Sequence, residues 1–230
     1  MVITNSSHST AGASHQVTSP LGSFPLGHNV HIMVGNVLRP FLTMRRNAPN
    51  ANYAGWENST FLILNMAYEM TVQHMPLYES SPVDIWCETT FISMLPEWVQ
   101  SLLIQGRIPF ASGLTAGTLQ QGNNGLLRRV FIPTITELGV LSATNTFQIG
   151  SDFGIFDDND SRTLRNSAGI GVLQHTRTVN TTGNHIVGVS AIGNIGPSHA
   201  LTANMAIRPI IALPNTARVT AEGFLTGGAD

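Results

Sequence analysis

The sequence predicts an α+β fold, a single compact domain of mainly antiparallel short strands with one pair of helices and long loops. Three observations predict it. Helical spacing of apolar residues is confined to about residues 81–105, the other apolar runs are short and separated by Gly and Asn, and several polar stretches are too long for tight turns. We expect an extended N-terminal arm over residues 1–27, followed by the domain over residues 28–230.

The helix pair begins at a strong start signal. Ser81 is a favourable N-cap, and Pro82 follows at the first helical position, where its missing N–H is not needed. Apolar residues then recur at helical spacing until Pro96, which ends or restarts the helix, and a second apolar stripe follows. We expect Trp86 and Trp98 to be core anchors of a helix–turn–helix pair that packs on a sheet.

Several segments have the composition of strands. Residues 28–38 and 41–46 predict two strands on either side of Pro40, and residues 128–133 predict a third. The apolar run 61–68 is compatible with a strand or a helix, because periodicity does not separate the two over so short a length. Further short strands are expected after residue 170, so strands dominate the domain.

The N-terminal segment differs from the rest of the chain. Residues 1–27 are rich in Ser, Thr, Gly and His and contain no Asp, Glu, Lys or Arg. Such a segment cannot bury enough apolar surface to order itself. We therefore expect this arm to contact a neighbouring subunit or shell rather than its own domain, which makes it an assembly contact in a homo-oligomer or larger particle.

Charged residues are scarce, at 10% of the chain, against about a quarter in ordinary domains. All 11 basic residues are arginine, the net charge is -2, and the pI is near 6.4. This balance provides no long-range attraction for nucleic acid or for an anionic membrane, so we expect neither as a partner. Low charge with many small polar residues is typical of proteins in packed assemblies or outside the cell.

Cysteine content and the N-terminus bear on the compartment. Cys87 is the only cysteine, which excludes an intrachain disulfide and a cysteine-rich metal site, and we expect it to be a small buried side chain. The first residues lack the basic and apolar regions of a secretory signal, and no apolar run approaches the roughly 20 residues of a membrane helix. These features predict a protein that is made and assembled in the cytoplasm.

Two short frames place an arginine inside a strand-like run. Arg208 precedes Pro209 in the apolar run 205–214, and Arg177 lies in the frame 174–178. A buried guanidinium needs partners for its N–H donors. Each arginine is therefore either a structural latch or a group that binds a phosphate or an anionic sugar. We expect latches, because both lie in strand frames rather than at loop tips.

A short turn after the 128–133 strand provides partners for these arginines. Thr134 and Glu137 have capping-box spacing, in which each side chain binds the other residue's backbone N–H. We expect loop carbonyls and a carboxylate such as Glu137 to satisfy the latch arginines. Arg129 belongs to the same group of candidates, either structural or ligand-binding.

Four short motifs follow one another along the chain in a characteristic order. They are Ser81-Pro-Val-Asp-Ile-Trp86, then Arg129-Val-Phe-Ile-Pro133 with Glu137-Leu-Gly139, then Thr176-Arg177-Thr178, then Ile207-Arg208-Pro209 with Leu213-Pro214. In this order and spacing, over about residues 78–217, the chain resembles a structural module of unassigned function from bacteriophages and prophages of Gram-positive hosts, often encoded near tail or capsid genes. The Arg208-Pro209 strand is also similar to C-type-lectin-like modules of phage adhesins, which implies a C-type-lectin-like fold.

One acidic segment has the oxygen density of a calcium loop. It contains Asp157, Asp158 and Asp160, but Arg162 and Ala168 stand where an EF-hand has its glycine and its bidentate glutamate. A solvated acidic turn is the expected state, with bound Ca²⁺ as the alternative, and we expect no other cofactor. His28 and His31 are three residues apart, which places them on opposite faces of a strand and argues against a shared metal.

No catalytic motif is evident, so we expect a protein that is not an enzyme. The resemblance implies a virion structural protein, either a capsid decoration or head-fibre subunit, or a tail or baseplate component that binds other virion proteins and its own copies. The alternative is an adhesin that attaches to host-surface glycan through loops 111–125, 147–166 and 180–200. A hydrolase of cell-wall or capsule polymer would need paired carboxylates, and the acids here are few and scattered.

Overall fold

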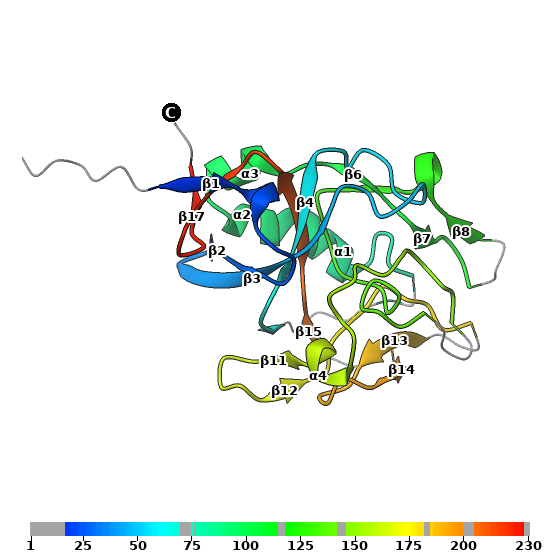
Figure 1. The fold of residues 1–230 in the computed structure, drawn as a ribbon. Coiled ribbons are helices and arrows are strands. Elements are labelled where there is room, and N and C mark those ends of the chain that lie inside the picture. Colours follow the sequence, from blue (N-terminus) through cyan, green and yellow to red (C-terminus); the bar gives the residue numbers. More distant parts are fainter. Residues whose placement is uncertain are drawn as a thin grey trace, which may run out of the picture.

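A five-stranded antiparallel sheet lies at the centre of the computed structural model, which describes residues 17–69, 75, 77–114, 118–141, 146–181, 185–199 and 205–227 (Figure 1). Its strand order is β10-β16-β4-β3-β2. In that order the strands are Val130–Phe131, Ile210–Pro214, Ser59–Leu64, Val37–Arg46 and Asn29–Val34. All six residues of β4 are buried, as expected for a central strand that is covered on both faces.

The first hairpin differs from its prediction. The chain does not break at Pro40, which lies within β3 opposite His31 of β2. It turns instead at Gly35, whose φ of +60° is readily adopted by glycine. The N–H of Gly35 donates to the carbonyl of Met94 at 2.6 Å, so the hairpin tip is held against the helical layer.

The helical layer contains α1 (Pro82–Trp86), η2 (Cys87–Phe91), α2 (Ile92–Met94) and α3 (Glu97–Leu102). Ser81 caps α1 as predicted, because its hydroxyl oxygen accepts from the N–H of Asp84 at 3.2 Å. The segment η2 is a π-helical turn that joins α1 to α2 without a break. The predicted helix pair is therefore confirmed, although its second helix ends at residue 102.

Of the two tryptophans that were predicted to be core anchors, Trp98 was assigned wrongly and Trp86 packs against the core. Trp98 is 37% exposed, because α3 is one short helix that buries only Val99. Trp86 is partly buried and contacts Tyr68, with ring centroids 5.0 Å apart. The fully buried tryptophan is Trp56, which precedes β4 and packs against Phe61 at 5.1 Å.

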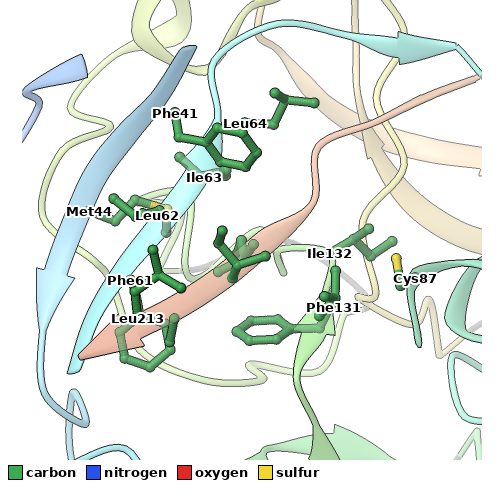
Figure 2. Packing of buried hydrophobic residues seen from close by; sticks show 14 of the residues in the cluster. Phe41, Met44, Phe61, Leu62, Ile63, Leu64, Cys87, Phe131, Ile132 and Leu213 are labelled. Carbon is green, nitrogen blue, oxygen red and sulfur yellow. The ribbon is translucent and has the colours of Figure 1, made fainter. Parts of the chain in front are cut away.

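The core joins the sheet to the helical layer (Figure 2). Side chains of β3, β4 and β16 meet Phe131 of β10, and Cys87 of η2 lies beyond Ile132 in the same cluster. Cys87 is buried as predicted, and burial raises the pKa of its thiol. The 147–166 loop also enters this core, since Phe153 packs on Phe61 at 5.4 Å.

Shorter elements surround the sheet. Two-stranded ribbons pair β6 with β9, β7 with β8, β11 with β12, β13 with β14, and β5 with β15. Their strands are Gly106–Ile108, Leu126–Arg128, Phe110–Ala111, Leu119–Gln120, Leu164–Arg165, Gly171–Val172, His185–Val189, Ile195–His199, Tyr68–Glu69 and Ala206–Ile207. The remaining helical turns are η1 (Leu21–Ser23), η4 (Gly122–Asn124) and α4 (Asn159–Arg162). The architecture is thus mostly antiparallel strands with few short helices in one compact domain.

The expectation for the arm needs a correction. β1 (Thr18–Pro20) pairs with β17 (Arg218–Thr220), which pairs in turn with β18 (Leu225–Thr226). Leu21 of η1 is fully buried in the main core. The chain therefore packs on its own domain from residue 18, because β1 and Leu21 supply the ladder and apolar contacts that the polar composition concealed. Residues 1–16 lie outside the described residues.

Within the part of the chain that the structure describes, every helix is too short or too polar to cross a membrane.

Candidate functional site

The two motif arginines lie near the end of the sheet where β10 ends and β16 begins. Arg177 lies in the extended segment before β13, where its N–H donates to the carbonyl of Pro133 at 3.0 Å. Arg208 lies between β15 and β16, where Pro209 interrupts the ladder. The carbonyl of Pro209 still accepts from the N–H of Leu64 at 2.9 Å, which holds Arg208 at the end of β4.

The turn after β10 forms the capping box that the sequence predicts. The N–H of Thr134 donates to Glu137 Oε2 at 2.9 Å, and the N–H of Glu137 donates to Thr134 Oγ1 at 3.1 Å. These two bonds direct the carboxylate inward, where Tyr53 Oη donates to Glu137 Oε1 at 2.5 Å. Glu137 is fully buried, so the turn delivers a carboxylate to the interior.

Arg177 meets this carboxylate. Its Nη2 donates to Glu137 Oε1, its Nη1 donates to the carbonyl of Pro109, and its Nε donates to the carbonyl of Ile132 at 2.9 Å. Both side chains of the ion pair are 0% exposed. The guanidinium also lies over the ring of Phe131, 5.4 Å from its centroid. Each nitrogen of Arg177 therefore has a partner, and the group acts as a closed latch.

Burial and the neighbouring groups have opposite effects on the pKa of Glu137. Burial raises the pKa of Glu137, while Arg177, Tyr53 and the N–H of Thr134 oppose that rise by stabilising the charged form. Burial, together with the charge of Glu137, raises the pKa of Tyr53, so the phenol remains a hydrogen-bond donor. Gly150 has no side chain to fill this space, and a Cβ there would lie 3.1 Å from Glu137 Oε1. The buried groups of the cluster therefore bind one another.

Arg208 is as deeply buried as Arg177, at 2% exposure, but its surroundings differ. Its Nε donates to the carbonyl of Leu64 at 2.9 Å, and its Nη2 donates to Asn65 Oδ1 at 3.3 Å. The guanidinium carbon lies 4.8 Å from the ring centroid of Phe156. All three partners are neutral, so the positive charge of Arg208 is solvated but not neutralised.

The third side-chain nitrogen of Arg208, Nη1, differs from the other two in its hydrogen bonding. Among the residues that the structure describes, no group accepts a hydrogen bond from the buried Nη1. Burial also lowers the pKa of the guanidinium to about 10, with no carboxylate to oppose the shift. A buried donor without an acceptor is costly and rare in folded proteins, which marks this position as a candidate site.

A pocket of about 340 Å³ lies beside Arg208. Leu42 of β3, Asn65 after β4 and the segment from residue 155 to 165 line it, together with Arg208. The lining residues are Leu42, Asn65, Ile155, Phe156, Asp160, Ser161, Thr163, Leu164, Arg165 and Arg208. One carboxylate and two guanidinium groups line the pocket, so its net charge is positive.

The rim of this pocket carries an ion pair. Arg165 Nη2 and Asp160 Oδ1 are 2.8 Å apart, with side chains 52% and 83% exposed. Pairs this exposed contribute little to stability and exchange partners readily. Asp160 therefore restrains the rim only weakly.

A second pocket, of about 320 Å³, lies next to the first along the chain. Arg39 and Tyr68 line it together with Met66, Ala67, Asn166 and Ser167. The guanidinium of Arg39 lies 5.2 Å from the ring centroid of Tyr68, and its Nη1 contacts Met66 Sδ at 3.2 Å. The two pockets are separated by the strand-like contact in which the N–H of Ala67 donates to the carbonyl of Arg165 at 2.9 Å.

The remaining arginine candidate is structural in its contacts. Arg129 is 3.7 Å from Glu88, and its side chain is 38% exposed. Glu88 Oε1 accepts from the backbone N–H groups of Arg129 and Val130, at 2.7 and 2.8 Å. A carboxylate from η2 thus covers the outer edge of β10, which is one way that proteins protect an exposed sheet edge.

The acidic segment is a helix start. Asp158 caps α4, accepting from the N–H of Ser161 at 2.8 Å, and hydrogen bonds from Ser161 lower the pKa of this carboxyl. Asp160 pairs with Arg165, and Asp157 is exposed. Over the described residues, no group of three or more His, Cys, Asp or Glu side chains converges as metal ligands. The geometry assigns these carboxylates to capping and surface contacts.

The expectation for the histidines is wrong in one respect. A Cβ on Gly223 would lie 3.6 Å from His28 Nε2 and 3.5 Å from His31 Nδ1, so both rings face the same glycine. His28 precedes the first residue of β2, where strand alternation does not yet apply. The two rings pack on Phe24 and Phe224, at centroid distances of 4.7 and 5.3 Å.

The aromatic residues of the 147–166 loop are not exposed platforms for sugar. Phe147, Phe153 and Phe156 are all buried, and Phe156 lies under Arg208. Sequence reasoning missed Tyr68 and Asn65, which line the two pockets, because they follow β4 in a run whose secondary structure was ambiguous. Asn65, inside this run, was the available signal, since Asn commonly marks the end of a strand.

A match to the family described as "Domain of unknown function (DUF6273)" covers residues 51–215. The matched span includes both motif arginines, the latch and most of the lining of the two pockets, while Arg39 and Leu42 precede it. No curated protein and no solved structure matches the chain.

Proposed function

The chain belongs to the DUF6273 family, and we propose that it is a non-enzymatic structural subunit of a bacteriophage virion. In this proposal it is a surface-exposed capsid decoration or head-fibre subunit, or a tail or baseplate subunit. It contacts other virion proteins and its own copies. The domain is C-type-lectin-like, as the Arg208-Pro209 strand and the long loops suggest.

The observation that carries the proposal is the closed Arg177–Glu137 latch. Arg177, one of the two motif arginines, has every side-chain nitrogen bonded and no exposed surface on its side chain. An arginine that binds substrate must present donors to a cavity. A motif whose charged pair is used entirely inside the fold supports a scaffold, and a scaffold is what a virion subunit requires.

The N-terminal region supplies the anchor in this proposal. β1 is an edge strand of the β1-β17-β18 sheet, and Val17 just before it is 78% exposed. Edge strands and exposed apolar residues are common points of contact between subunits. We assign the assembly contact to residues 1–16 together with the outer edge of β1, in place of the whole segment 1–27.

The proposal is tested in particles of the phage that encodes this chain. Antibodies against residues 51–215 should label purified virions in immunogold electron microscopy. Deletion of residues 1–16 should remove the label while the isolated domain keeps its melting temperature, because β1 starts at Thr18. Purified virions that lack the protein would contradict the proposal.

One observation favours the alternative, a receptor-binding adhesin for host-surface glycan. The pocket beside Arg208 is walled by residues of the 147–166 loop, which is one of the three loops expected to bind glycan. Tyr68 adds a half-buried aromatic ring to the neighbouring pocket. Binding of purified protein to host cells, lost on treatment of the cells with periodate to destroy glycan, would favour this alternative over a purely structural role.

A further inference from the structure

We propose that the pocket beside Arg208 binds a single oxyanion group, a phosphate, sulfate or carboxylate, through the free edge of the Arg208 guanidinium. This inference concerns one pocket and is independent of where the protein lies in a particle. It also gives the glycan alternative a ligand class, because phosphate and carboxylate are the charged groups of acidic surface polysaccharides.

The first argument is the contrast between two equally buried arginines. Arg177 has Glu137 as a counter-charge, whereas the partners of Arg208 are a carbonyl, an amide oxygen and an aromatic ring. Removing a charge from water without a counter-charge is strongly unfavourable. A fold that neutralises one buried arginine and leaves the other unpaired keeps the second available for an anion from outside.

The second argument is preorganisation. The bonds from Nε to Leu64 and from Nη2 to Asn65, with Phe156 beneath, fix the plane of the Arg208 guanidinium. Nη1 then remains as a donor without an acceptor among the described residues. A donor that is already held in place loses little entropy on binding, which raises affinity for a small ligand.

The third argument is the charge of the lining. Among the described residues that line the pocket, Asp160 is the only one with a carboxylate, and Arg165 and Arg208 carry the two guanidinium groups. Because the Asp160–Arg165 pair is exposed, an oxyanion can replace Asp160 as the partner of Arg165. The ligand would then be held between Arg165 at the rim and Arg208 at the floor.

The size of the pocket limits the ligand. A volume of about 340 Å³ is at the small end of the roughly 300–1,000 Å³ of small-molecule sites. This is enough for a phosphate with its attached group or for one sugar ring with a carboxylate. Leu42, Ile155 and Phe156 give the pocket an apolar wall, against which the apolar face of a sugar ring can pack.

The experiment is calorimetric titration of the full chain, at low ionic strength, with inorganic phosphate, sulfate and galacturonate, and with galactose as the neutral control. We expect saturable binding of at least one anion at one site and none of galactose. The anion that binds best identifies the group, since phosphate and sulfate represent one source and galacturonate the other. No saturable binding of any of the three anions would overturn the inference.

Three variants locate the site. Arg208→Met should weaken binding by roughly tenfold to a hundredfold, the equivalent of one charge-assisted hydrogen bond. Asp160→Asn should strengthen it about twofold to fivefold, because it removes a like charge from the rim and releases Arg165. Arg129→Gln removes a positive charge that does not line the pocket, and binding should stay within about twofold of the unmodified chain.

The experiment tests the site even if Arg208→Met does not fold. Circular dichroism shows whether Arg208→Met is folded, and unchanged affinity in the folded variant would place the anion elsewhere and overturn the inference. If that variant is unfolded, Asp160→Asn decides, because Asp160 is exposed and its loss leaves the core intact. Affinity that is equal or weaker in Asp160→Asn would then contradict the site, and tighter binding would support it.

Discussion

Replacement of Arg177 by Met removes the latch while keeping a side chain of similar length and apolar stem. Three bonds disappear, to Glu137 and to the carbonyls of Pro109 and Ile132. Leaving one member of a buried ion pair uncompensated costs about 3–5 kcal/mol. Each buried carbonyl that loses its donor adds about 1–3 kcal/mol. These contributions overlap, because losing Arg177 raises the pKa of Glu137 and so eases protonation of the unpaired carboxylate.

We therefore expect Arg177→Met to lower the free energy of unfolding by about 4–6 kcal/mol, a large part of the roughly 5–15 kcal/mol of an ordinary domain. The assay is urea unfolding followed by tryptophan fluorescence, which reports on Trp56 in the same core. Arg129→Met is the matched control. Its guanidinium is 38% exposed and 3.7 Å from Glu88, so its loss should cost less than about 1 kcal/mol.

The pH dependence of the stability lost in Arg177→Met distinguishes loss of the ion pair from loss of packing. In Arg177→Met, burial raises the pKa of Glu137 further, because no guanidinium opposes it. A carboxyl whose folded pKa lies above its unfolded value favours the folded state at low pH, and this contribution is lost as pH rises through the folded pKa. The deficit of the variant should therefore shrink as the pH is lowered through the raised pKa of Glu137. A deficit within about 1 kcal/mol of the Arg129→Met control, or one that does not change with pH, would refute the latch.

Two further predictions concern the packing around the site and the N-terminal boundary. Gly150→Ala should lower the free energy of unfolding by about 2 kcal/mol or more. Gly150 has a φ of +87°, and the new methyl would lie 3.1 Å from Glu137 Oε1. Urea unfolding measures this change, and an unchanged free energy of unfolding would show that the latch is loosely packed. Deletion of residues 1–23 should lower the melting temperature, since it removes the fully buried Leu21, whose burial stabilises by about 1.5–3 kcal/mol. Calorimetry that shows the same melting temperature with and without residues 1–23 would contradict the placing of η1 in the core.

Local signals predicted the parts of this fold that depend on local chemistry. Ser81 caps a helix because a hydroxyl and a proline at adjacent positions favour that start whatever surrounds them. The Thr134–Glu137 capping box follows in the same way from two side chains three residues apart. Leu21 and Trp98 were placed wrongly, because burial depends on which distant segment packs over a residue. The sequence around an apolar side chain does not indicate whether a distant segment will bury it.

The different surroundings of the two motif arginines could not be predicted from the sequence. Both lie in apolar frames, and both were expected to be latches on that ground. Arg177 is paired with Glu137, whereas among the described residues no carboxylate pairs with Arg208. Both arrangements depend on contacts between residues 40 to 144 positions apart. No feature within either frame distinguishes a neutralised arginine from an unneutralised one.

The central claim is that Arg177 is closed within the fold while Arg208 remains open to an anion. A crystal structure of the full chain, grown at a phosphate concentration well above the dissociation constant from calorimetry, tests it directly. We predict a phosphate within hydrogen-bond distance of Arg208 Nη1 in the pocket beside Arg165, and the Arg177–Glu137 pair unchanged. A structure in which Nη1 of Arg208 is bonded to a carboxylate or carbonyl of the chain itself, with no phosphate in the pocket, would contradict the claim.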